Sequence, residues 1–120
     1  MLAYKLLGSG LNTLSVESMK DVATGLAAAG TNQATAYEVT FAKNSFATVA
    51  SGTGAVLDSD AAPGDSQLVY NGGANALRVF PPTSAGINNL AANAAVLIQP
   101  ATACEFFMLT TTLWAANLSA

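Results

Sequence analysis

Hydrophobic and polar residues alternate in short runs over most of this chain. The first clear run is 34–42, where Tyr37, Val39 and Phe41 share one face of an extended segment and smaller or polar residues share the other. Turn residues such as glycine, proline, asparagine and aspartate separate it from seven further β-rich runs. These are 46–50, 55–57, 66–70, 76–80, 94–98, 104–110 and 113–118. The pattern predicts a mainly β protein of about seven or eight short strands.

The spacing of the runs indicates how the strands are arranged. No strand–helix–strand alternation appears, and internal self-similarity is too weak to indicate a solenoid. Short strands with regularly spaced turn signals are typical of β-sandwiches and barrels. The segment 71–75 contains an Asn-Gly pair and predicts a hairpin between the runs 66–70 and 76–80. We therefore expect an antiparallel β-sandwich or barrel over residues 31–120.

The N-terminal stretch, residues 1–30, has a different pattern. Apolar residues recur at near-helical spacing at four positions, Leu14, Met19, Val22 and Leu26. Gly30 is a suitable stop signal for a helix, whereas Gly25 lowers the helix propensity of the segment. The alternative is an extended arm that lies on a partner. The domain prediction is an N-terminal arm or short helix over 1–30, followed by a β-sandwich domain over 31–120.

Composition adds that the chain carries little charge. Charged residues make up 9% of its 120 residues, against about 25% in ordinary soluble domains. Hydrophobic residues make up 52%, but only 8% of the chain is aromatic and alanine is abundant. With few charges to solvate an exposed surface, we expect neighbouring subunits to cover much of it.

The residue types exclude several functional classes. Because the chain has no histidine, it has neither a Ser-His-Asp triad nor a histidine-ligated metal site. The single cysteine, Cys104, precludes an internal disulfide, and with no cation beside it we expect a buried, unreactive thiol. A net charge of −3 disfavours nucleic acid as a partner. No apolar run reaches membrane-spanning length, and residues 1–8 lack a secretory signal, so we expect no membrane contact.

Acidic residues are the remaining candidates for chemistry. Three of the seven lie in the segment Asp58–Asp65. Clustered carboxylates suit calcium, but the spacing does not match an EF-hand, and Asp, Pro and Gly are common turn residues. We interpret the segment as a surface loop, with a metal site as the alternative. Glu38 and Glu105 lie on predicted strands, and a carboxylate pair suits glycoside hydrolysis, but no other catalytic group accompanies them. The sequence thus predicts no enzyme, with no catalytic, cofactor-binding or metal-binding residues.

Two further residues are candidates for contact with another chain. Arg78, the only arginine, lies between two apolar strand residues and faces the opposite side. There it either reaches water or pairs with an acid of a neighbouring subunit. Trp114 and Tyr70 offer flat faces that suit sugar binding, but packing in a core or interface is preferred. The predicted interface residues are Leu14, Met19, Val22, Leu26, Arg78 and Trp114.

One stretch resembles a sequence found in small virion proteins of tailed bacteriophages. It is Gly64 to Pro82, GDSQLVYNGGANALRVFPP, with a strand ending in Tyr-Asn, a Gly-Ala-Asn turn, and a strand closing in an aromatic residue and proline. Gly86–Leu90 and the upstream residues 29–36 are also similar, so the resemblance covers roughly 29–118. Where such proteins have an assigned role, it is structural, as capsid decoration (cement) proteins or as tail or fibre modules.

The resemblance implies partners and a location rather than catalysis. Decoration proteins are commonly β-rich trimers on the capsid surface, which fits a chain short of charge. We therefore predict a virion structural protein made in the host cytoplasm. In this reading it is a homotrimeric capsid decoration protein that stabilises the phage head by contacting itself and the major capsid protein or other virion proteins. The alternative is a tail, baseplate or fibre module with a receptor-binding or assembly role.

Overall fold

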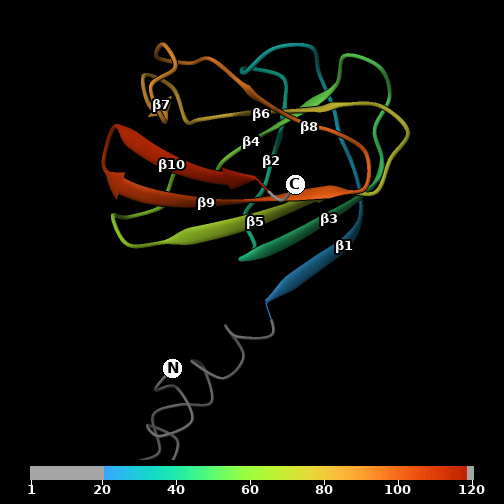
Figure 1. Ribbon diagram of the computed structural model, residues 1–120, viewed down its shortest axis with the longest axis horizontal. Coiled ribbons are helices and arrows are strands. Elements are labelled where there is room, and N and C mark those ends of the chain that lie inside the picture. The colour runs from blue at the N-terminus through green and yellow to red at the C-terminus, as the bar shows by residue number, and fades with distance from the viewer. Residues whose placement is uncertain (1–20, 119–120) are drawn as a thin grey trace, which may run out of the picture.

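The chain is built from strands and turns wherever the structure describes it. The computed structural model describes residues 21–118, whose path Figure 1 shows. Residues 21–118 contain no helix and form ten strands. The strands are β1 (Val22–Ala27), β2 (Tyr37–Glu38), β3 (Lys43–Thr48), β4 (Gly54–Val56), β5 (Ser66–Asn71), β6 (Leu77–Phe80), β7 (Gly86–Ile87), β8 (Val96–Ile98), β9 (Thr102–Thr110) and β10 (Leu113–Leu118). The prediction of a mainly β protein is confirmed.

Successive strands from β1 to β9 alternate between two sheets. The six-stranded sheet has the order β1-β3-β5-β9-β10-β7, and the four-stranded sheet has the order β2-β4-β6-β8. From β1 to β6 every strand lies in the sheet opposite to its predecessor, so the chain coils and gains one strand in each sheet per turn. In Figure 1 the four-stranded sheet lies above strands β3, β5 and β9. This coil is the arrangement of a β-solenoid, and the predicted antiparallel sandwich or barrel is wrong.

The direction of pairing follows from the coil. β1 pairs in parallel with β3 and β3 with β5, while β2 pairs in parallel with β4 and β4 with β6. Antiparallel pairs form where the coil ends, between β5 and β9, β6 and β8, and β9 and β10. β10 also pairs in parallel with β7. Parallel neighbours need a long connection. Here a strand of the opposite sheet supplies it, which strand spacing alone does not reveal.

The predicted hairpin between β5 and β6 is also wrong, because the two strands lie in different sheets. The segment between them is a corner that Asn71 holds in shape. Its Nδ2 donates to the carbonyl oxygens of Asn75 and Ile98, each at 2.8 Å. Its Oδ1 accepts from the N–H of Gly73 at 2.9 Å. An Asn-Gly pair suits a tight bend of either kind, and the partners that the two strands find decide between hairpin and corner.

The corners on this side of the coil stack on one another. The Asn75 Nδ2 donates to the Val49 carbonyl at 2.9 Å. The Ala28 N–H donates to the Thr48 carbonyl at 2.9 Å, which ties in the corner that follows β1. Gly73 lies so close to the neighbouring corner that an added Cβ would stand 2.6 Å from the Val49 backbone nitrogen. The close packing of the corners therefore requires glycine at this position.

Two buried amides hold the corners on the opposite side of the coil. Gln67 donates to the Phe41 carbonyl at 3.1 Å and accepts from the Asp58 N–H at 3.0 Å. Asn44 donates to the Phe41 carbonyl at 2.9 Å and to the Leu68 carbonyl at 3.2 Å. These amides satisfy backbone groups at the bends next to the strands, and the bond from Asn44 to Leu68 also joins β3 to β5.

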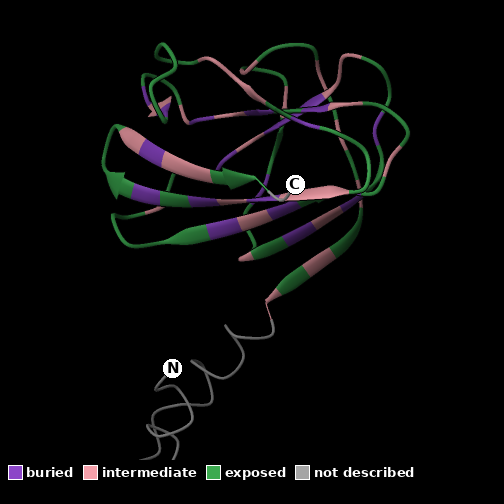
Figure 2. Cartoon of the chain, viewed as in Figure 1, coloured by how far each residue is buried: buried purple, intermediate pink, exposed green. Residues whose placement is uncertain are grey.

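The core lies between the two sheets. Its large buried side chains include Trp114, Phe46, Phe106 and Val69 from the six-stranded sheet, and Leu77, Val79 and Ile98 from the four-stranded sheet. Figure 2 shows buried bands alternating with more exposed ones along the six-stranded sheet, as the period of two requires. Full burial of side chains of this size stabilises a fold by about 1.5–3 kcal/mol each, so both sheets depend on this shared core.

Residues 21–30 contain no part of the predicted N-terminal helix. They include β1, whose Leu26 is half-buried against the core. Gly25 adopts a φ of 68°, and the register with β3 shifts on either side of Leu26. Pairing with β3 and burial of Leu26 thus override the near-helical spacing of the apolar residues. Leu14 and Met19, which belong to the same prediction, lie outside the described residues.

Candidate functional site

The outer face of the six-stranded sheet, formed by the side chains that point away from the core, carries exposed apolar groups. They include Val22 at 46% exposed, Tyr70 at 38%, Phe107 at 37% and Leu109 at 55%. β9 carries apolar residues on both faces. Its Phe107 and Leu109 are exposed, and they alternate with Cys104, Phe106 and Met108, which are buried. A sheet with one face in water usually alternates apolar with polar side chains, so this face is unusually apolar.

One row of the outer face places opposite charges on either side of an apolar residue. The strand register sets Lys43 of β3 beside Leu68 of β5, and Leu68 beside Glu105 of β9. Val22 and Asn117 extend the row at its two ends. Neighbouring strands lie about 4.8 Å apart, so the two charged residues are about 10 Å apart. They are the only charged residues in the strands of this sheet.

The rows on either side are uncharged. One contains Ser45, Tyr70 and Ala103, and the other contains Ser66, Phe107 and Ala115. Aromatic enrichment together with few charges is the composition of surfaces that pack against protein. The outer face is therefore the candidate functional site, and its composition suits contact with protein.

The structure places the predicted interface residues in different surroundings. Val22 lies on the outer face, whereas Leu26 packs against the core. Arg78 is exposed on β6, in the four-stranded sheet. Trp114 is fully buried, so it offers no flat surface to a sugar. Of the four described candidates, only Val22 belongs to the outer face.

Pattern reasoning missed the row of Lys43, Leu68 and Glu105. The three residues come from strands far apart in the sequence, and only the sheet order makes them neighbours. The sequence did contain one indication of an apolar outer face. Residues 102–110 are apolar at both odd and even positions over most of the run. A strand of that composition covers a core with one face and leaves the other apolar.

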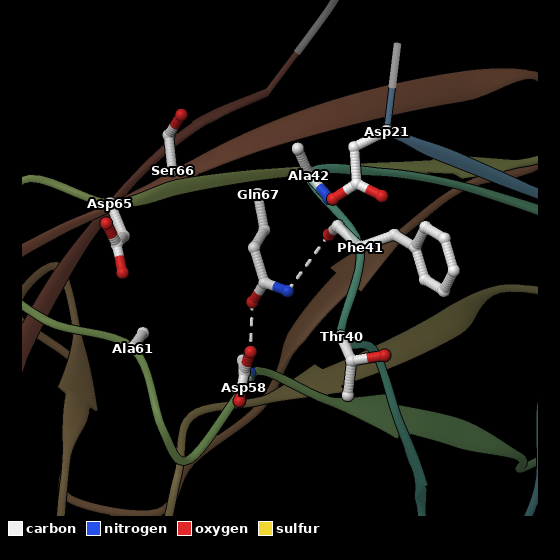
Figure 3. A pocket seen from close by; sticks show the side chains of 9 residues that line it. All are labelled: Asp21, Thr40, Phe41, Ala42, Asp58, Ala61, Asp65, Ser66 and Gln67. Atoms are coloured by element: carbon white, nitrogen blue, oxygen red, sulfur yellow. Dashed lines mark hydrogen bonds between the residues drawn. The ribbon is translucent and has the colours of Figure 1, made fainter. Parts of the chain in front are cut away.

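A cavity of about 220 Å³ lies beside the corners that Gln67 holds, and Figure 3 shows its lining. Three carboxylates line it, and each accepts a hydrogen bond from a backbone N–H. Asp21 accepts from Ala42 at 3.1 Å, Asp58 from Asp60 at 2.9 Å, and Asp65 from Ala62 at 2.9 Å. Within residues 21–118, no three acidic or cysteine side chains are grouped so as to hold a metal ion. The contacts fit the surface-loop interpretation, in which the carboxylates stabilise turns.

The thiol of Cys104 is buried in β9, as the sequence predicts. Burial raises the pKa of the thiol from 9.0 to about 11, and the nearby charge of Glu105 adds a smaller contribution in the same direction. A backbone hydrogen bond at Asn117 acts in the opposite sense. The thiolate, which is the nucleophilic form, is therefore disfavoured at neutral pH.

The structure does not bring Glu38 and Glu105 together. Glu38 lies on β2 in the four-stranded sheet, where it accepts hydrogen bonds from the N–H and the hydroxyl of Ser59, both at 2.9 Å. Glu105 lies on the outer face of the other sheet. The two carboxylates therefore belong to different surfaces and do not flank a common cleft.

Comparison of the chain with protein-family models, curated proteins and solved structures finds no match. Within residues 21–118, no helix has the length and apolarity to cross a membrane. Residues 21–118 thus form a β-solenoid whose six-stranded sheet has an apolar outer face.

Proposed function

We propose that this protein is a structural protein of a bacteriophage virion. It is a capsid decoration (cement) protein that stabilises the head and assembles as a homotrimer. The observation that carries the proposal is the outer face, where Tyr70, Phe107 and Leu109 are exposed and only Lys43 and Glu105 are charged. Such a face is suited to protein contact. The resemblance of residues 64–82 to phage virion proteins supports the class.

The corners of the coil support a structural role in a second way. Asn71, Gln67 and Asn44 are buried and bridge neighbouring turns through their amides. Bridged corners hold the sheet in one shape, and a preformed surface loses little conformational entropy on docking. The partners in this proposal are other copies of the chain and the major capsid protein or other virion proteins. No catalytic group, cofactor or metal enters the mechanism.

Copy number and shell binding test the proposal. The full-length protein is mixed with shells of major capsid protein, and the bound copies are counted by quantitative mass spectrometry. The same method counts the copies in purified virus particles. We expect many copies per particle and shells that withstand more heat. Phe107→Ser should reduce binding, whereas Leu97→Ser, an exposed position on the four-stranded sheet, serves as the matched control. A folded protein that never joins shells or particles would contradict the proposal.

A tail, baseplate or fibre module is the second candidate. The observation that favours it is the coil from β1 to β6, because stacked turns can extend along one axis, as in repeat proteins. This candidate requires few copies per particle and adsorption of the purified protein to host cells. The same mass-spectrometric count distinguishes the two candidates.

A further inference from the structure

We infer that the outer face binds a second copy of this chain in a twofold contact, in which Lys43 of each copy faces Glu105 of the other. The inference rests on the proposed structural function and specifies one of its contacts. Leu68 lies at the centre of the row and separates the two charges by one strand on each side. The row is therefore symmetric in position and opposite in charge.

The symmetry follows from the positions of the charges. In a pair of sheets packed face to face, a twofold axis lies in the plane between them. When that axis runs along β5, it carries β3 of one copy over β9 of the other. Lys43 then faces Glu105 twice, once on each side of the axis. A twofold contact of this kind uses the same patch on both copies.

The charges also select against the other twofold arrangement. A twofold axis perpendicular to the strands would place each strand over the same strand of the second copy. Lys43 would then face Lys43, and Glu105 would face Glu105. Like charges placed together at an interface cost several kcal/mol. The row thus specifies the orientation of the pair as well as its partner.

Apolar side chains occupy the middle of the same contact. Leu68 and Tyr70 both point outward from β5 and would lie near the axis. Each would contact the same residue of the second copy. Packed sheets keep their strands within about 30° of each other and lie about 10 Å apart, which suits contacts between such side chains. Phe107 on the neighbouring strand extends the apolar area. A second copy therefore covers the aromatic groups that the single chain exposes.

The twofold contact is separate from the threefold contact of the proposed homotrimer. It covers the outer face of the six-stranded sheet, so the assembled copies join the shell together and Phe107→Ser weakens shell binding by weakening their assembly. If the pair forms alone, the assembly has two copies. If a threefold contact forms elsewhere on the chain, pairs and trimers combine into six copies, so both cases give an even number.

Charge reversal tests the inference. The full-length protein is studied by sedimentation and light scattering over a range of concentrations and salt. We expect two or six copies, association that weakens with added salt, and at least about tenfold weaker pairing in Lys43→Glu and in Glu105→Lys. The double variant Lys43→Glu/Glu105→Lys restores the complementary row and should recover wild-type pairing within about threefold. Arg78→Glu changes a charge on the other sheet and should leave pairing unchanged.

Other results would overturn the contact. One is a wild-type protein that has one or three copies at every concentration, of which three copies would remove the twofold contact and keep the proposed homotrimer. Another is a double variant that pairs as weakly as the single variants, and a third is an Arg78→Glu variant that is weakened as much. Circular dichroism and Trp114 emission confirm the fold of each variant. Shell binding is measured on the same preparations, so a protein that pairs without joining shells would remove the proposed function and keep the contact. A charge-reversed variant that no longer pairs but still joins shells would keep the contact and contradict the role of the outer face in the proposed function.

Discussion

Asn71 should be the most sensitive polar residue in the described fold. Its side chain is fully buried and makes three hydrogen bonds to the backbone of two corners. Replacing it with alanine removes all three bonds. The carbonyl of Ile98, a fully buried residue, then lacks this donor, whereas Asn75 is exposed and water can reach its carbonyl.

The cost of Asn71→Ala can be worked from these partners. A buried backbone group left without a partner costs about 1–3 kcal/mol, and each of the other two bonds contributes about 0.5–1.5 kcal/mol. The sum is a loss of about 2–6 kcal/mol in the free energy of unfolding, a large part of the roughly 5–15 kcal/mol that holds a domain together. Asn71→Asp keeps the shape but turns a negative charge toward two carbonyl oxygens, so at pH 7 it should be at least as destabilising.

Urea unfolding followed by Trp114 emission measures this loss, because Trp114 is the only tryptophan and is fully buried. Asn117→Ala, at an exposed position of β10, is the matched control and should stay within about 0.5 kcal/mol of the wild type. If Asn71→Ala lost less than about 1 kcal/mol, or no more than the control, the corner would not depend on its amide and the reasoning would be refuted.

Three further outcomes are expected. Gly73→Ala should cost about 1–3 kcal/mol in urea unfolding, because its Cβ meets the Val49 backbone, whereas Gly86→Ala places a Cβ 3.5 Å from the nearest atom and should be close to neutral. The folded state raises the pKa of Cys104 from 9.0 to about 11. Its contribution to stability is therefore complete below about pH 9 and is lost as the pH rises through about 11. Urea unfolding at several pH values should show the wild type falling over that window relative to Cys104→Ala. A thiol reagent at pH 8 should modify Cys104 much more slowly in the native protein than in urea, and equal rates would show that the thiol is accessible.

Local pattern predicted much of the secondary structure. The runs 66–70, 104–110 and 113–118 correspond to β5, β9 and β10, because a period of two and flanking turn residues act within a few residues. The same reasoning failed at Val22–Ala27, where near-helical spacing indicated a short helix, with an extended arm as the alternative, and the chain forms β1. A hydrophobic pattern there was outweighed by pairing with β3, a partner that lies further along the sequence.

The segment 71–75 separates local from tertiary information most clearly. Its residues indicated a tight bend, and a tight bend is present, but the strands on either side lie in different sheets. The choice depends on whether β5 gains more by pairing with β6 or with β3 and β9. The answer depends on burial on both sheets, so the residues of the turn do not determine it.

The sequence by itself determined that this chain is a β protein with little charge, no histidine and one buried cysteine, because residue types and short-range periodicity act locally. Only the tertiary structure decided that the strands coil between two sheets and that Lys43, Leu68 and Glu105 form one row. The reason is that strand order and register depend on which distant strands share a core. The surface chemistry created by that order exists only after the chain has folded.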